Sequence, residues 1–161
     1  MIRFSTLDVD MPPLEPQRDK AWITEVAHSY GKSIGELYYY FCSDDKLLEI
    51  NKERLGHDFY TDIVTFPLTN DHIILSSEFC ISVDRIKENA QTFGRSFESE
   101  LHRVIIHGVL HLIGFGDHTE EAEKEMRKQE EKCLVLFETM TTDFEQGFID
   151  RELRPGHDQS S

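Results

Sequence analysis

The stretch HGVLHLIGFGDH, residues 107–118, places three histidines and an aspartate within twelve positions of otherwise apolar sequence. His107 and His111 are four residues apart, so on a helix their side chains project from one face, one turn apart. A glycine after the apolar run predicts the end of that helix, and Asp117 and His118 follow in the next loop. The stretch therefore predicts two imidazoles on a helix and further donors on the returning chain.

This arrangement is typical of an open metal site. Two imidazoles one turn apart can bind a single Zn²⁺, and one donor from the following loop leaves a fourth position for water. Both Asp117 and His118 can serve as that third ligand, and the residues themselves leave the choice open. An isolated HxxxH pair is often a chance pair of core histidines, but two donors that follow at once favour metal. We predict one zinc ion at His107, His111 and either Asp117 or His118, with His111 also required for catalysis.

The residue after the first histidine bears on the type of reaction. Zinc peptidases of the HExxH type carry their general base, a glutamate, at that position. Gly108 occupies it here, so the sequence disfavours a peptidase. A zinc peptidase-like hydrolase is nevertheless retained as an alternative.

The rest of the chain predicts one α+β domain. Its 161 residues suit a single domain, and strands lie mostly early and helices mostly late, without regular alternation. We predict a small mixed sheet of about four strands covered by helices over residues 1–140, followed by a polar tail, 141–161, that is partly disordered. The expected strands are 2–6, 36–42, 61–66 and 78–83, and the expected helices are 17–30, 45–55, 84–93, 97–113 and a last one from about 119.

Charge and cysteine content limit the classes of function. The formal charge of −14 argues against broad, non-specific contact with nucleic acid, and the acidic run 119–131 is interpreted as a solvated helix face. Three widely spaced cysteines in apolar sequence predict buried free thiols in a reducing compartment, most simply the cytoplasm. No apolar run is long enough to span a bilayer, so we expect no membrane partner.

Two motifs resemble the YbeY family, which are metal-dependent endoribonucleases of ribosomal RNA maturation. HGVLHLIGFGDH is similar to the family signature H-G-x-L-H-L-x-G-Y-D-H. INKERLGHDFYTDIVTFP, residues 50–67, is similar to L-N-x-x-Y-R-x-x-D-x-P-T-D-V-L-S-F, and the matching positions are Asn51, Asp58, Thr61, Asp62 and Phe66. The resemblance spans residues 36 to 137.

The resemblance implies a zinc-dependent endoribonuclease specific for single-stranded RNA. It also implies a place in ribosomal RNA processing and ribosome quality control, with ribosomal RNA and ribosomal subunits or assembly factors as partners. A zinc-containing assembly factor without catalytic activity is a further alternative.

The chain departs from the family pattern at the third ligand. The family has a histidine six residues after the second ligand, and an ungapped count places Asp117 there because Gly116 has no counterpart. If the loop absorbs one residue, His118 takes the position instead. Asp62 is expected to orient a ligand histidine through a hydrogen bond and is assigned to the catalytic set. The alternative interpretation of Thr61–Asp62 is a turn at the entry of a strand.

The second departure concerns RNA contact. The family has an arginine implicated in activity where this chain has Leu55, with Arg54 one position away. Lys52 and Arg54 are the candidates for substrate binding, within a local positive groove predicted from Lys46, Lys52, Arg54, Arg85 and Arg103.

Overall fold

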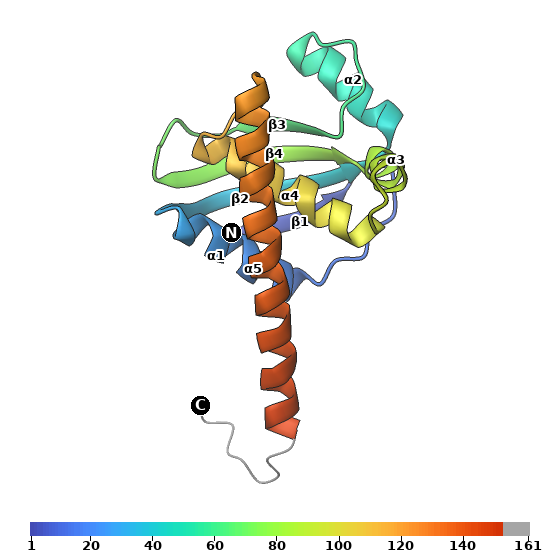
Figure 1. The fold of residues 1–161 in the computed structure, drawn as a ribbon. Helices are drawn as coiled ribbons and strands as arrows, with labels where there is room; N and C mark the ends of the chain where they lie inside the picture. The colour runs from blue at the N-terminus through green and yellow to red at the C-terminus, as the bar shows by residue number, and fades with distance from the viewer. Residues whose placement is uncertain (153–161) are drawn as a thin grey trace.

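The fold is a four-stranded sheet covered by helices, as predicted for an α+β domain (Figure 1). The computed structural model describes the backbone of residues 1–152 and the side chains of residues 1–141. The strand order is β1-β2-β4-β3, in which β1 and β4 pair parallel with β2, and β3 pairs antiparallel with β4. The strands are β1 (Ile2–Thr6), β2 (Ser33–Cys42), β3 (Ile63–Pro67) and β4 (Ile74–Ser82). The helices are α1 (Pro16–Ser29), α2 (Asp44–Leu55), α3 (Val83–Phe93), α4 (Phe97–Ile113) and α5 (Glu120–Glu152).

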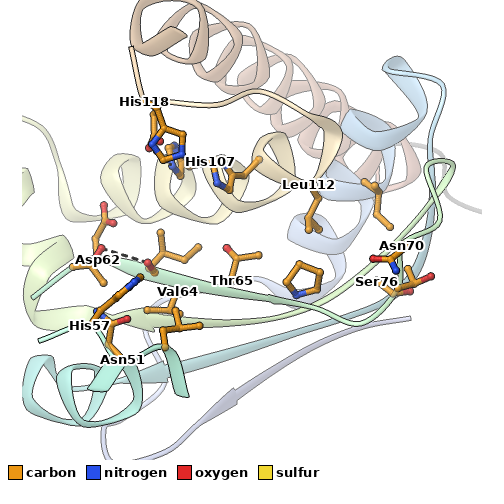
Figure 2. Close-up of a pocket in the computed structure, with 18 of the residues that line it drawn as sticks. Asn51, His57, Asp62, Val64, Thr65, Asn70, Ser76, His107, Leu112 and His118 are labelled. Carbon is orange, nitrogen blue, oxygen red and sulfur yellow. Dashed lines mark hydrogen bonds and ion pairs between the residues drawn. The ribbon is translucent and has the colours of Figure 1, made fainter. Parts of the chain in front are cut away.

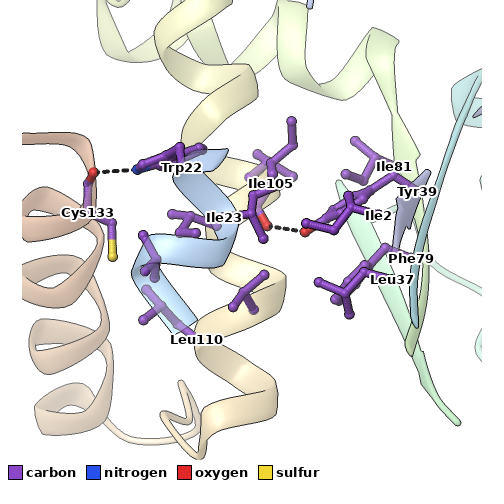
Figure 3. Close-up of a cluster of buried hydrophobic side chains, with 14 of the residues drawn as sticks. Ile2, Trp22, Ile23, Leu37, Tyr39, Phe79, Ile81, Ile105, Leu110 and Cys133 are labelled. Atoms are coloured by element: carbon purple, nitrogen blue, oxygen red, sulfur yellow. Dashed lines mark hydrogen bonds between the residues drawn. The ribbon is translucent and has the colours of Figure 1, made fainter. Parts of the chain in front are cut away.

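Helix α4 packs on β3 and β4, and helices α1, α3 and α5 contact it. It begins at a serine cap, where Ser96 Oγ accepts a hydrogen bond from Ser99 N at 3.0 Å, and it ends at Gly114, whose φ is +128°. Its residues Ile105 and Leu110 are completely buried. Figure 3 shows Ile105 between α1 and the strands and Leu110 next to α1, so α4 and the residues it carries are held by the core.

Helix α5 packs across α1 and α4 through a stripe of apolar residues. Met126 and Cys133 are buried, and Ala122 and Phe137 are partly buried. The indole Nε1 of buried Trp22 donates to the carbonyl oxygen of Cys133 at 2.9 Å (Figure 3). This hydrogen bond fixes α5 to α1, and therefore fixes which residues of α5 face α4.

The last helix is longer than the sequence predicted. A polar tail was expected from residue 141, but the α5 backbone continues to Glu152 and extends away from the sheet (Figure 1). Glutamate and glutamine favour helix, and no proline interrupts the chain before Pro155, so no strong stop signal ends the helix at 141. The remainder of the predicted tail, 153–161, lies outside the described residues.

The three cysteines have the environment that the sequence predicts. Cys42, Cys80 and Cys133 are free and buried, as predicted. Within the described part of the chain, no helix is both long enough and apolar enough to cross a membrane.

Candidate metal centre and its cleft

Helix α4 presents both histidines of the HxxxH pair on one face. The His107 and His111 rings are nearly parallel, with centroids 6.0 Å apart and an interplanar angle of 14°. His107 is half-buried and His111 is exposed, and both line one open cleft. The two imidazoles therefore lie side by side on one face of α4, next to the cleft.

The ring orientation of each histidine is fixed through its Nδ1 atom. Nδ1 of His107 lies 2.7 Å from Oε2 of Glu130, and Nδ1 of His111 lies 3.0 Å from the carbonyl oxygen of Phe115. Because both partners are acceptors, each Nδ1 donates a hydrogen and each neutral ring keeps its lone pair on Nε2. Metal-binding histidines are commonly oriented in this way, through a carboxylate or a backbone carbonyl.

Glu130 corrects the interpretation of the acidic run 119–131. Most of that run is exposed, but Glu130 is only 3% exposed and also forms an ion pair with Arg103. The solvated-face interpretation is therefore wrong at this position. Helical spacing could have located it, since Glu130 follows Met126 by four residues and precedes Cys133 by three, on the same buried stripe.

The loop after α4 brings the other two predicted donors to the cleft. The cleft has a volume of about 930 Å³, and Asp117 and His118 line it together with His107 and His111. Asp117 Oδ2 lies 3.8 Å from His107 Nε2, and His118 lies on the same side of the pocket as His107 (Figure 2). Among the described residues, no group of three or more His, Cys, Asp or Glu side chains lies close enough together to hold one metal ion. The donor set suits zinc in its chemistry, with two oriented imidazoles and two loop donors facing open space.

Asp62 lies directly before β3 and lines the same cleft. Burial raises the pKa of its carboxyl group, although the nearby His107 and the backbone N–H groups of Asp62 and Ile63 act in the opposite direction. The orienting hydrogen bond to His107 comes from Glu130, so Asp62 acts on that ring through charge. Its backbone also serves the strand, because its carbonyl oxygen accepts from Ser82 N at 2.9 Å.

The environment of His107 favours its protonated form in the metal-free protein. Burial lowers the pKa of the ring, but the hydrogen bond to Glu130 and the charges of Glu130, Asp62 and Asp117 outweigh that effect and raise it. The same carboxylates would favour a divalent cation at this position.

The predicted positive groove is largely neutralised by carboxylates. Lys52 pairs with Asp58 at 3.2 Å, and the Arg54 guanidinium lies over the Phe66 ring at 4.0 Å. The other predicted cations also have acidic partners: Lys46 pairs with Glu49, Arg85 with Asp44, and Arg103 with Glu100 and Glu130. Neither Lys52 nor Arg54 is among the described residues that line the cleft. Their assignment to substrate binding stays a prediction.

Gly108 is needed for packing of α4 on the sheet. A Cβ atom at this position would lie 2.7 Å from Cε1 of Phe79 and 3.0 Å from Cδ1 of Ile63, and Phe79 is fully buried. The position faces the core instead of the cleft, so a glutamate base of the HExxH type has no room there.

Comparison with known proteins agrees with the two motifs. The family model for endoribonuclease YbeY matches residues 10–138. The chain belongs to the YbeY endoribonuclease family. The endoribonuclease YbeY of Phocaeicola vulgatus is 46% identical over 136 residues, which cover 84% of this chain and 98% of that protein. The one from Bacteroides thetaiotaomicron is 44% identical over 135 residues, with the same two coverages of 84% and 98%.

A solved structure has a similar fold over nearly the whole chain. The solution structure of TM1509 from Thermotoga maritima superimposes with a TM-score of 0.61 at 25% sequence identity, and the match covers 98% of this chain and all of that one. The named YbeY relatives are endoribonucleases, which are hydrolases acting on RNA, so the predicted enzyme class is confirmed. The predicted resemblance to the YbeY family is confirmed with it.

Proposed function

We propose that this chain is a zinc-dependent endoribonuclease that cleaves single-stranded RNA during ribosomal RNA maturation and ribosome quality control in the cytoplasm. The observation that carries the proposal is the pair of imidazoles whose Nδ1 atoms are held by Glu130 and Phe115, so that both Nε2 atoms stay available beside an open cleft. Membership in the YbeY family supports RNA as the substrate. Ribosomal RNA and ribosomal partners enter through the family resemblance.

We propose His107, His111 and His118 as the zinc ligands. The order of Asp117 and His118 repeats the aspartate–histidine order of the family signature, and the additional Gly116 lies in the loop between α4 and α5, where an extra residue is accommodated. An imidazole also reaches further from an open loop than an aspartate carboxylate does. Zinc at such a site supplies Lewis-acid polarisation of a phosphodiester oxygen.

Asp62 is the proposed proton-transfer group of the cleft. Burial raises its carboxyl pKa, and general acid–base catalysis is more efficient when the pKa of the group approaches the working pH. Glu130 has a different task, because it holds the Nδ1 hydrogen of His107 and so aims Nε2 at the cleft. Neither task uses a residue at the position of Gly108, which agrees with a reaction other than HExxH-type peptide hydrolysis.

The decisive experiment measures RNA cleavage by protein of defined zinc content. His111→Ala is expected to lose zinc and cleavage together while its circular dichroism spectrum stays that of the unchanged chain. His72→Ala is the matched control, since His72 is an exposed histidine that lines another part of the same cleft. Equal cleavage by the unchanged chain and by His111→Ala would indicate a contaminating nuclease and contradict the proposal.

The same preparations separate the two alternatives. A zinc peptidase would hydrolyse a protein substrate such as casein, and no hydrolysis is expected here. An assembly factor with purely structural zinc would bind the metal with four protein ligands and leave single-stranded RNA intact. X-ray absorption of the zinc-loaded chain is expected to give three protein ligands.

A further inference from the structure

An aromatic pair lies at the mouth of the cleft, on the segment that joins α2 to β3. The His57 and Phe59 rings are stacked, with centroids 5.1 Å apart and an interplanar angle of 21°. Both residues line the cleft that contains His107 and His111, yet Phe59 remains 55% exposed. In Figure 2 the His57 side chain extends into the pocket, across from the side that carries His107. An aromatic surface is therefore open to a ligand inside the cleft.

The segment that carries this pair is anchored to α2. Asn51, only 1% exposed, donates from Nδ2 to the carbonyl oxygen of Phe59 at 3.1 Å, and its own carbonyl accepts from His57 N at 3.1 Å. The ion pair between Lys52 and Asp58 spans the same segment at 3.2 Å. Side chains on a segment fixed in this way lose little conformational freedom when a ligand binds. The backbone that carries the two rings is thus fixed before any ligand arrives.

Phosphate attraction is weak at this edge of the cleft. The chain carries a formal charge of −14, Lys52 in the last turn of α2 already has a carboxylate partner, and Arg54 lies over the Phe66 ring, outside the described lining of the cleft. An RNA strand that binds here must therefore draw much of its affinity from uncharged contacts. Stacking of a base on an aromatic side chain provides such a contact and is worth roughly 5- to 150-fold in affinity per base.

We propose that the His57–Phe59 pair binds one unpaired nucleobase by stacking and thereby restricts the cleft to single-stranded RNA. This inference rests on the proposed ribonuclease function and gives its strand preference a structural cause. A base within a duplex is covered by its neighbours, whereas an unpaired base offers a whole face to an aromatic ring. Leu55, 43% exposed on the same rim, adds apolar contact beside the rings.

The test compares two ligands that differ only in their bases. Dissociation constants are measured by fluorescence anisotropy for a 2′-O-methyl uridine decamer, which resists cleavage, and for an abasic decamer with the same backbone. Phe59→Leu keeps an apolar side chain but removes the ring, and Phe59→Trp keeps an aromatic one. Phe93→Leu is the matched control, because Phe93 is similarly exposed (58%) at the end of α3. It is not among the described residues that line the cleft.

If the rings stack on a base, the loss of affinity in Phe59→Leu should depend on whether the decamer carries bases. Phe59→Leu is expected to bind the uridine decamer about tenfold more weakly, with less than about a twofold change for the abasic decamer. Phe59→Trp should bind at least as tightly as the unchanged chain, and Phe93→Leu should match it. In the unchanged chain, binding of the uridine decamer is expected to fall only gently as salt rises, because few phosphates are neutralised.

Three results would overturn the inference, and they are distinguishable from failure of the ribonuclease function. If Phe59→Leu binds the uridine decamer as tightly as the unchanged chain and still cleaves RNA, the stacking proposal is wrong but the ribonuclease function stands. Equal weakening for both decamers assigns the effect to the backbone of the segment. An unchanged chain that neither binds nor cleaves single-stranded RNA removes the proposed function, and the inference with it.

Discussion

The carboxylate of Glu130 sets the direction in which His107 offers its lone pair. It is buried, it accepts from Nδ1 of His107 at 2.7 Å, and its other oxygen pairs with Arg103. Glu130→Gln keeps the size of the side chain and one acceptor oxygen but removes the charge. Loss of such a partner typically lowers metal affinity about 10- to 100-fold, and that range is expected for zinc here. Competition with a chromophoric chelator measures it.

The neighbouring residue supplies the control for that measurement. Glu131 is exposed on the outer face of α5, so Glu131→Gln makes the same chemical change without touching the histidine. Zinc affinity equal in all three proteins would show that Glu130 does not orient His107.

A second comparison decides which loop residue completes the site. His118→Ala is expected to lose zinc as severely as His111→Ala, because the imidazole is removed outright. Asp117→Ala is expected to weaken zinc binding about tenfold or less, through loss of a carboxylate whose Oδ2 lies 3.8 Å from His107 Nε2. Chelator competition on both variants gives the answer, and the reverse order of affinities would assign the third ligand to Asp117.

The start of α2 depends on a carboxylate that lies 35 residues earlier in the sequence. Ser43 Oγ accepts from Lys46 N at 3.1 Å and caps the helix, while Asp8, beyond β1, accepts from Ser43 N at 2.8 Å. The hydrogen bonds from Ser43 hold the pKa of Asp8 below its usual 3.8. A carboxyl group whose pKa is lower in the folded state adds stability above 3.8, which is lost as the pH falls through the folded pKa.

Replacement of Asp8 should therefore have a pH-dependent effect. Asp8→Asn is expected to unfold at a lower urea concentration than the unchanged chain at pH 6–7. The two midpoints should approach each other as the pH falls below about 4. Asp10→Asn removes an exposed carboxylate in the same segment, and its urea midpoint is expected to equal that of the unchanged chain. A gap for Asp8→Asn that stays constant down to pH 3.5 would exclude the carboxylate as its source.

Local signals made the helices predictable, whereas the strand boundaries required contacts between distant residues. Ser96 and Gly114 mark the two ends of α4 in the sequence, and the helix has those ends. The sequence predicts a strand that starts at residue 36, directly after Gly35, but β2 starts at Ser33 and contains this glycine. There a Cβ would meet Ser76 Oγ at 2.3 Å, and the register between β2 and β4 shifts. A glycine that permits close approach within a sheet looks, in sequence, like a glycine that ends a strand.

The whole molecule explains why the candidate site was only partly predictable. His107 and His111 belong to one short motif, so spacing alone placed them together. Glu130 comes from α5, and its contact with His107 depends on how α5 crosses α4, which the Trp22–Cys133 hydrogen bond helps to fix. The order of the helices in the sequence does not specify how α5 packs across α4. Parallel pairing of β1, β2 and β4 depends equally on distant segments.

The size of the folding unit can be tested by shortening the chain. The described core runs from Ile2 to Met140, and the family model ends at residue 138. A chain that ends at Thr141 therefore keeps the described core contacts and should unfold in one cooperative transition. Because changes outside such contacts typically cost within about 0.5 kcal/mol, its midpoint should lie within about 2 °C of that of the full chain.

A second, shorter chain makes that result interpretable. Ending the chain at Gln129 removes Cys133, the acceptor for Trp22, together with Glu130, which holds His107. That chain is expected to lose both the cooperative transition and zinc binding, since a buried indole N–H and a buried face of α4 are left without their partners. Calorimetry with and without zinc measures both properties. A fall of 10 °C or more (on the order of 3 kcal/mol at this size) on ending at Thr141 would show that residues 142–161 belong to the folding unit, and the boundary predicted near residue 140 would be wrong.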